Sequence, residues 1–292
     1  MIEQVDLTET RRRTRFAPAP TGYLHLGHVA NAIHVWGSPA AAGGSVLLRI
    51  EDHDRARSRP AYDSALLEDL AWLGFVADEG PVRQSDDDGP YLAALERLRA
   101  QGLVYGCDCT RGTFSDWARE RGRAWHGPGC PGACRTRSVG GPVLRVDLGG
   151  GSERWMDDLV GPCADEVAAG GDVPIRDRDG QWTYGFSVAV DDLRQGVDLV
   201  VRGRDLLHAT AAQIRLGRIL GRDTRAMFAH HPLVRRPDGR KLSKADGDTS
   251  VRDLRAAGRS AAGLIGEAAA AVGLIEAPRP IDAHDVTSLF TR

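Results

Sequence analysis

The sequence predicts an α/β protein built on a parallel sheet, with a small cysteine-containing insertion and a short helical segment at its C-terminal end. An apolar run typical of a buried strand, Ser45–Ile50, leads directly into the carboxylates of Glu51 and Asp52. Helical patterns with apolar residues three and four apart follow over Ala61–Leu73 and Pro90–Gln101. Four cysteines then lie in a stretch rich in Gly, Pro and Arg. Strands that alternate with helices are typical of a parallel sheet.

The composition is that of an ordinary globular protein and excludes a disordered or fibrous chain. Of the 292 residues 42% are hydrophobic and 27% charged, and 38 basic residues face 40 acidic ones. The net charge of −2 gives no general signal for nucleic-acid binding. The longest weakly polar stretch, Ala261–Ile275, falls short of the roughly 20 residues that span a bilayer. The N-terminus has no apolar run after its arginines, so we expect a cytoplasmic protein that does not bind membranes.

The first half of the chain predicts a strand, a turn and a helix before the buried strand. Thr14–Ala17 has the pattern of a short strand, Pro18–Gly22 that of a turn, and a helical pattern continues through Trp36. Glu51 and Asp52 would then lie at the carboxyl end of a parallel strand. Ligands of such sheets bind at that edge.

In the second half of the chain the hydrophobic periodicity is first weak and then becomes clear again. From Cys107 to about Gly180 periodicity is weak, which predicts an inserted module. Within the module we expect a strand at Val143–Leu148. After the module we expect strands at Thr183–Val190 and Val197–Arg202, a helix at Leu206–Leu220 and a strand at Met227–His230. We therefore divide the chain into the first half of the main α/β domain (1–104), an inserted module that contains the cysteines (105–182), the second half of the main domain (183–248) and a helical C-terminal segment (249–292).

Two short motifs predict a site for a nucleoside triphosphate. His25-Leu26-Gly27-His28 falls between the first strand and the first helix, where two imidazoles can face phosphates near a helix N-terminus and Gly27 lets a base approach the backbone. Only two of the 38 basic residues are lysines, Lys241 and Lys244, both in the sequence KLSK. A compact ammonium on a loop can stabilise the charge that develops on a leaving pyrophosphate.

The cysteine spacing predicts a structural metal site. Cys107-x-Cys109 and Cys130-x3-Cys134 form two close pairs, a donor set that suits tetrahedral zinc. His126 could replace one ligand. The fifth cysteine, Cys163, is expected to be a small packed residue.

The order of these motifs resembles that of the class I aminoacyl-tRNA synthetases, whose two signatures are called HIGH and KMSKS. The glutamate-specific branch is more similar still, and within it the short glutamyl-queuosine tRNA(Asp) synthetases, which lack the anticodon-binding part of glutamyl-tRNA synthetase. The matching segments are Arg15–Gly22, His25–His28, Leu48–Asp52, Tyr184–Phe186, Val190–Asp192, Val201–Gly203 and Lys241–Lys244. The resemblance covers about residues 13–245, and the 48 residues after Lys244 are too few for another large domain. It implies a class I synthetase fold with a Rossmann-type sheet.

The resemblance also implies roles for individual residues. Glutamate needs cations for its side chain and an acidic partner for its amine. The residues assigned to the amino acid are Arg15, Phe16, Ala17, Pro18, Ala19, Glu51, Tyr184 and Arg202. The residues assigned to ATP are His25, Gly27, His28 and Lys244, with His25, His28, Lys241 and Lys244 acting in catalysis. The zinc ligands are Cys107, Cys109, Cys130 and Cys134.

Two residues depart from the family pattern. Ala19 stands where the family usually has serine, which removes a hydrogen bond worth about 0.5–1.5 kcal/mol. Arg204 stands where an acidic or small residue is more usual.

The expected activity is activation of L-glutamate with ATP and Mg²⁺, followed by transfer to queuosine in the anticodon of tRNA(Asp), by a monomer. Arg11–Arg15 and Arg119–Arg123 are candidate contacts to the RNA backbone. Three alternatives stay open: a truncated glutamyl-tRNA synthetase that charges a 3′ end, an adenylate-forming transferase with a non-RNA acceptor, and an inactive RNA-binding paralogue.

Overall fold

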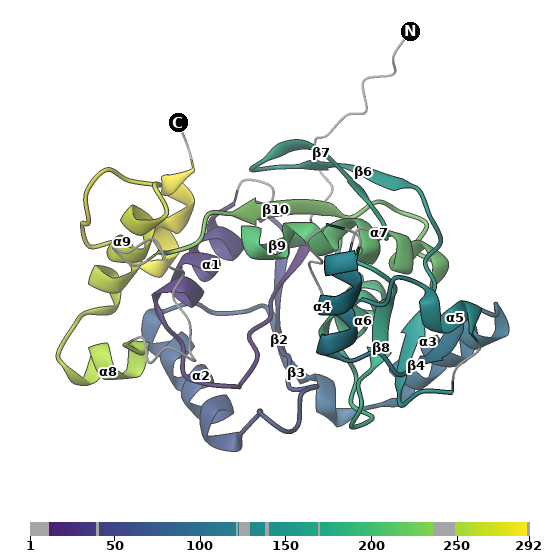
Figure 1. The fold of residues 1–292 in the computed structure, drawn as a ribbon. Helices are drawn as coiled ribbons and strands as arrows, with labels where there is room; N and C mark the ends of the chain where they lie inside the picture. The colour runs from purple at the N-terminus through teal and green to yellow at the C-terminus, as the bar shows by residue number, and fades with distance from the viewer. Residues whose placement is uncertain are drawn as a thin grey trace, which may run out of the picture.

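A parallel sheet forms the centre of the molecule, in agreement with the predicted fold class (Figure 1). The computed structural model describes residues 12–38, 41–120, 122, 129–137, 140–168, 170–235 and 249–290. Strand β1 (Arg13–Phe16) pairs in parallel with β2 (Ser45–Ile50), which pairs in parallel with β3 (Glu79–Arg83). Strand β9 (Leu199–Gly203) lies beside β1, where the Asp198 backbone amide donates to the Arg13 carbonyl. It pairs in parallel with β10 (Met227–His231).

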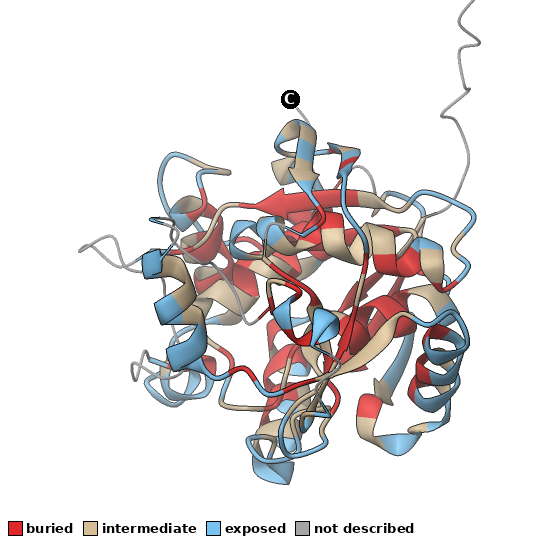
Figure 2. Ribbon diagram, turned by 45° about the vertical axis from the view of Figure 1, so that its right-hand side comes forward, coloured by how far each residue is buried: buried red, intermediate tan, exposed pale blue. Residues whose placement is uncertain are grey.

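Helices cover this sheet and hold its hydrophobic core. They are α1 (Leu26–Gly37), α2 (Pro60–Leu73), α3 (Gly89–Ala100), α6 (Tyr184–Arg194) and α7 (Thr210–Ile219), with the short 3-10 turns η2 (Gln84–Asp86) and η3 (Arg204–Ala209). Figure 2 shows the strands at the centre mostly buried and the outward turns of the helices exposed. Val46, Leu48 and Ile50 of β2 pack into one cluster with α1 and the C-terminal helices. The continuous apolar run of β2 is therefore explained by burial of the strand on both faces.

The inserted region is largely antiparallel. Its first part consists of β4 (Val104–Cys107), α4 (Arg111–Glu120), α5 (Ala133–Thr136) and β5 (Val143–Val146), and its second part of β6 (Ser152–Asp157), β7 (Gly161–Glu166) and β8 (Val173–Arg176). Strands β4, β5 and β8 form one small sheet. The β6–β7 hairpin instead extends the sheet beyond β10. The boundaries given above for the four parts of the chain stay a prediction.

One predicted element is wrong. The segment Thr183–Val190, expected as a strand, is the beginning of helix α6. Residues 186–192 are all buried, including the polar Ser187, Asp191 and Asp192, so this stretch lacks the alternation of buried and exposed faces that marks a surface helix. A short apolar run of this kind has the same appearance in a buried strand and in a buried helix.

The C-terminal segment returns to the first helix. It contains α8 (Val251–Ala256), α9 (Ala261–Ala271) and the 3-10 turn η5 (Ala283–Leu289), and Figure 1 shows it beside α1 at the opposite side from α4 and α5. The Val251 backbone amide donates to the Leu24 carbonyl at 2.7 Å, and Ser250 forms a β-bridge with His25. No helix in the described ranges combines the length and apolar character needed to cross a bilayer.

A buried carboxylate on α2 makes stability depend on pH. Asp69 is 2% exposed, and its Oδ2 has no hydrogen-bond partner among the described residues. Burial raises the pKa of Asp69 to about 6, although Arg255 and Arg252 oppose the shift. The folded state therefore holds this proton more tightly than the unfolded state, and stability falls as the pH rises from 3.8 to about 6. The loss amounts to at most about 3 kcal/mol.

We therefore expect Asp69→Asn to flatten this part of the stability profile. The measurement is urea unfolding of the parent and variant chains at several values between about pH 4 and about pH 8. An unchanged slope in the variant would assign the pH dependence to other groups.

Candidate active site and cysteine cluster

A cavity of about 370 Å³ opens at the carboxyl ends of β1, β2, β9 and β10. Because parallel strands end at the same edge, residues far apart in the sequence meet there. The cavity contains eight of the residues predicted for amino-acid and ATP binding: Arg15, Ala17, His25, Gly27, His28, Glu51, Tyr184 and Arg202. Its other lining residues are Asn31, Val201, Gly203, Asp205, Leu206, His231, Leu233 and Val234.

The two imidazoles of the HLGH motif are oriented by the start of α1. His25 is the N-cap residue, and its Nδ1 accepts a hydrogen bond from the Gly27 backbone amide at 3.1 Å. The His28 Nδ1 accepts in turn from the His25 backbone amide at 3.1 Å. A neutral ring carries its proton on the other nitrogen, so Nε2–H is the donor of each imidazole. The ring centroids lie 4.0 Å apart.

Gly27 is required by the position of His25. A Cβ at residue 27 would lie 2.8 Å from His25 Cε1 and 3.0 Å from His25 Nδ1. Such a contact would displace the imidazole that the same turn orients. The glycine therefore has a local packing role in addition to the access to the backbone that the sequence suggested.

A buried network of charges supports Arg15 and Glu51. Arg49, fully buried in β2, donates to Asp192 Oδ1 at 2.8 Å and to Glu51 Oε1 at 3.0 Å. Arg15 Nε donates to the same Asp192 oxygen at 3.0 Å, and Arg15 Nη1 to the Val201 carbonyl at 3.1 Å. Two guanidiniums from neighbouring strands thus share one carboxylate of α6.

The network determines which of its groups are charged. Burial alone would raise the pKa of Asp192, but Arg15 and Arg49 outweigh it and hold the pKa below its usual range. Burial opposes the charge of Arg49 as well, and Asp192 and Glu51 outweigh it and raise the pKa of Arg49. Asp192 and Arg49 therefore hold each other in their charged forms, and their hydrogen bonds orient Arg15 and Glu51 at the cavity wall.

Arg202 has a different environment on the other side of the cavity. Its guanidinium is 4% exposed and donates to Gln213 Oε1 at 2.5 Å, to Thr210 Oγ1 at 2.9 Å and to His230 Nε2 at 3.0 Å. Burial lowers the pKa of Arg202 and raises that of Tyr184, the neighbouring residue on the cavity wall.

Some predicted residues lie elsewhere. Phe16 is 1% exposed in the hydrophobic core and packs against Trp36 with ring centroids 5.3 Å apart. Pro18 and Ala19 lie in the turn after β1 and are not among the cavity residues, although the Pro18 carbonyl accepts from the Glu51 backbone amide. The predicted residues Lys241 and Lys244 lie outside the described residues, as does His126.

The sequence analysis missed the residues that support the site. Arg49, Asp192, His230 and Asp157 have no assigned role there. An arginine inside the apolar run of β2 was a usable signal, because a charge in a buried strand needs a partner. Nothing in the sequence indicates that this partner is Asp192, since 143 residues separate the two.

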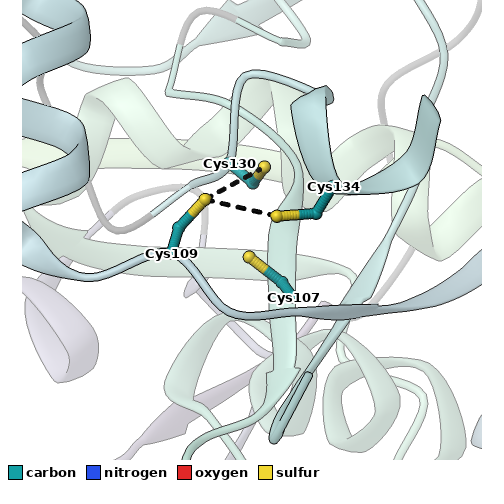
Figure 3. A group of neighbouring side chains, drawn as sticks. All are labelled: Cys107, Cys109, Cys130 and Cys134. Atoms are coloured by element: carbon teal, nitrogen blue, oxygen red, sulfur yellow. Dashed lines mark hydrogen bonds between the residues drawn. The ribbon is translucent and has the colours of Figure 1, made fainter. Parts of the chain in front are cut away.

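Four buried cysteines meet in the inserted region. Cys107 and Cys109 come from the end of β4 and the loop after it, and Cys130 and Cys134 from the loop before α5 and from α5 itself. Figure 3 shows their side chains gathered around one point. Their sulfur atoms all lie within 4.8 Å of one another, and Cys109 Sγ is 3.3 Å from Cys134 Sγ. All four are free thiols.

The donor set fits zinc, as the spacing predicted. Four sulfur ligands from two close pairs form the usual closed shell of a structural zinc site. Burial raises the pKa of Cys109 and of Cys134, and a coordinating divalent cation would deprotonate such thiols. Cys163 lies apart on β7, where its Sγ donates to the Gly161 carbonyl.

The two arginine-rich stretches and Arg204 also have defined places. Arg15 is buried in the site, so it cannot contribute to an RNA-binding surface. Arg119 is exposed and forms an ion pair with Asp116 on α4. Arg204 donates from Nε to the His230 carbonyl at 3.3 Å. Arg11, Arg121 and Arg123 lie outside the described part of the chain.

Comparison with known sequences gives a consistent set of relatives. The family model for tRNA synthetases class I (E and Q), catalytic domain, matches residues 12–265. A glutamyl-Q tRNA(Asp) synthetase of Symbiobacterium thermophilum is 39% identical over 295 residues, covering 94% of this chain and 91% of the relative. A protein of the same name from Burkholderia cenocepacia is 43% identical over 268 residues, covering 88% of this chain and 89% of the relative.

Solved structures share the fold. A glutamate tRNA ligase from Elizabethkingia meningosepticum, in complex with its amino acid, superimposes with a TM-score of 0.75 at 24% identity. A glutamate-tRNA synthetase from Elizabethkingia anophelis gives a TM-score of 0.76, also at 24% identity. Both matches cover 95% of this chain but only 64% and 65% of the solved chains.

Proposed function

The chain belongs to the class I tRNA synthetases of the glutamate and glutamine type, within the group of glutamyl-Q tRNA(Asp) synthetases, and from this membership we propose that it attaches glutamate to queuosine in the anticodon of tRNA(Asp). Membership makes it a ligase of the aminoacyl-tRNA synthetase type. The observation that supports glutamate activation is the cavity, which gathers guanidinium, carboxylate and imidazole groups at one edge of a parallel sheet, and the choice of acceptor follows the relatives.

The reaction has two steps. An α-carboxylate oxygen of glutamate attacks the α-phosphorus of Mg²⁺-bound ATP, and the bond to pyrophosphate breaks. A hydroxyl of queuosine then attacks the glutamyl carbonyl, loses its proton, and AMP leaves. The protein forms no covalent bond in either step, so positioning and electrostatic stabilisation supply the rate enhancement.

The cavity residues suit a dicarboxylate with one amine. In this proposal Arg15, Arg202 and Tyr184 contact the side-chain carboxylate, and Glu51 accepts from the ammonium group. Of the segment Phe16–Ala19 only Ala17 lines the cavity, so in this proposal it is the member of the segment that contacts the amino acid. The ion pairs of the Arg15–Asp192–Arg49–Glu51 cluster orient two of these groups before substrate arrives.

The triphosphate interacts with the HLGH turn and the lysine motif. The Nε2–H groups of His25 and His28 donate to phosphate oxygens, and Gly27 keeps the His25 ring in place. Lys244, helped by Lys241, stabilises the charge that develops on the departing pyrophosphate.

Replacing Lys244 by alanine should therefore slow adenylate formation by about 10²–10³. Lys244→Arg should also be slow, because a planar guanidinium replaces a compact ammonium. The measurement is glutamate-dependent exchange of labelled pyrophosphate into ATP. A near-normal rate for the alanine variant would remove Lys244 from the mechanism.

The acceptor is tested with labelled glutamate and three RNAs: tRNA(Asp) with queuosine, the same tRNA with guanosine at that position, and tRNA(Glu). We expect label on the first alone, and we expect glutamate activation without any tRNA. Label on tRNA(Glu) would instead identify a truncated enzyme that charges a 3′ end. Activation without transfer to any of the three would favour a non-RNA acceptor, and absence of both would favour an inactive paralogue.

Zinc has a structural role in this proposal. Cys107, Cys109, Cys130 and Cys134 would hold the ion and thereby join the loop after β4 to α5. A shell of four cysteines leaves no open position, so the site supports folding and takes no part in the reaction.

A further inference from the structure

Arg202 differs from the other two buried arginines near the cavity in the charge of its partners. Arg15 and Arg49 both form ion pairs with Asp192. Arg202 donates instead to an amide oxygen, a hydroxyl and an imidazole nitrogen, from Gln213, Thr210 and His230. Within the described ranges no carboxylate lies within ion-pair distance of its guanidinium. Among the described residues its positive charge is therefore buried at the cavity wall with no carboxylate in direct contact, and Asp192 favours this charge only from beyond ion-pair distance.

The hydrogen bond from Arg202 fixes the protonation of His230. An arginine can only donate, so His230 Nε2 must accept the bond from Arg202 Nε at 3.0 Å. The ring is then neutral, with its proton on Nδ1. Burial supports the neutral form, since it lowers the pKa of His230 more strongly than Asp157 raises it.

Asp157 at the end of β6 holds that proton in place. His230 Nδ1 donates to Asp157 Oδ2 at 2.5 Å, and both side chains are completely buried. The other oxygen, Oδ1, accepts from the backbone amides of His230, Leu159 and Val160 at 3.0–3.1 Å. Three backbone amides thus fix the Asp157 carboxylate. Its Oδ2 then accepts from His230 Nδ1, which allows only the tautomer with the proton on Nδ1.

We propose that Asp157 and His230 are positioning residues that hold Arg202 through a neutral acceptor and so reserve its charge for the substrate carboxylate. This inference rests on the proposed role of Arg202 in binding the glutamate side chain. A carboxylate in direct contact with Arg202 would neutralise the guanidinium, and the cavity would then distinguish a carboxylate from an amide only weakly. The imidazole orients Arg202 while it keeps the anion one residue further away. The pair therefore supports selection of glutamate over glutamine.

Two substitutions at residue 230 separate its two hydrogen bonds. His230→Gln can place an amide oxygen near the position of Nε2 and so keeps an acceptor for Arg202. His230→Asn can donate to Asp157 from near the position of Nδ1 but leaves Arg202 without that acceptor. We expect His230→Asn to raise the KM for glutamate about 10- to 100-fold, the usual range for a lost hydrogen bond to a charged group. His230→Gln should raise it less.

Asp157→Asn tests the second member of the pair. An amide NH₂ directed at Nδ1 would move the ring proton to Nε2. Two N–H donors, Nε2–H of His230 and Nε–H of Arg202, would then face each other and could not form a hydrogen bond. We expect a rise in the KM for glutamate like that of His230→Asn, with the KM for ATP unchanged and weaker discrimination against glutamine. Asp69→Asn is the matched control, because it replaces another buried carboxylate, on α2, by an amide. It should leave both KM values unchanged.

The assay is glutamate-dependent pyrophosphate exchange, together with the nitrogen chemical shifts of the histidine rings in ¹⁵N-histidine-labelled protein. We expect His230 to be protonated on Nδ1 in the parent chain and to lose this tautomer in Asp157→Asn. A proton on Nε2 in the parent chain would overturn the inference, whatever the activity. Equal KM values for the parent chain and His230→Asn, with Arg202→Ala impaired, would overturn it and leave the proposed function standing. Absence of any glutamate-dependent exchange in the parent chain would refute the proposed function, and the tautomer would still decide whether Asp157 and His230 act on Arg202.

Discussion

Removing zinc from the four-cysteine cluster is expected to unfold the inserted region, with a loss on the order of 10 kcal/mol of folding free energy. The four thiols lie within 4.8 Å of one another and join the loop after β4 to α5. Helix α4, between the two cysteine pairs, has no buried residue, so packing within it contributes little. The ion is therefore expected to supply most of the stability of the residues that lie between the two cysteine pairs. The purified chain should contain one zinc ion, and a chelator should open the region to limited proteolysis.

Two cysteine variants provide the matched comparison. Cys109→Ser removes a ligand and should lose zinc and stability together, whereas Cys163→Ser lies outside the cluster and should retain both. Metal content measured by mass spectrometry and the proteolysis pattern are the readouts. Equal zinc content in the two variants would contradict the assignment of these ligands.

Replacing Arg49 by methionine is expected to lower the free energy of unfolding by about 3–5 kcal/mol, because it leaves Glu51 buried without its cation and Asp192 with Arg15 alone. Arg49 is fully buried and joins Asp192 to Glu51. Without it the two carboxylates repel each other beside Arg15. We also expect weaker glutamate binding, since the same cluster orients Arg15 and Glu51. Urea unfolding and the KM for glutamate measure the two effects.

Arg13→Met is the control for Arg49→Met. Arg13 forms an ion pair of 2.7 Å with Glu79 in the same sheet, but the two side chains are 31% and 48% exposed. Exposed pairs of this kind contribute about 0–1 kcal/mol. Similar losses in the two variants would mean that burial of the Arg49 network adds nothing to stability.

The sequence allowed prediction of the elements whose environment follows a simple pattern. Ser45–Ile50 was predicted with its observed bounds because a strand buried on both faces reads as a nearly continuous apolar run, here interrupted only by Arg49 after Ser45. Helix α6 was not predicted, because its residues 186–192 are all buried, polar ones included, and so no exposed polar face reveals the helical period. The helix or strand state of such a segment depends on its neighbours.

The residues of the site also fall into a group that the sequence could predict and a group that it could not. Glu51 and Arg202 lie at the ends of strands, so the rule for parallel sheets and the resemblance both directed attention to them. The residues that support these side chains were not predictable. Asp157 contacts His230, 73 residues away in the sequence, and Asp192 contacts Arg15, 177 residues away. Such pairs depend on how strands are ordered in space, which local patterns do not contain.

The contact between Ser250 and His25 gives the C-terminal helices a part in the chemistry although they line no part of the cavity. Val234 lies on the cavity wall and Ser250 pairs with the backbone of His25, so the described residues on both sides of the lysine-bearing segment 236–248 are held close to the cavity. Anchoring of this kind raises the effective concentration of a tethered group. Shortening the protein after the lysine motif would therefore weaken catalysis without removing a single reacting side chain.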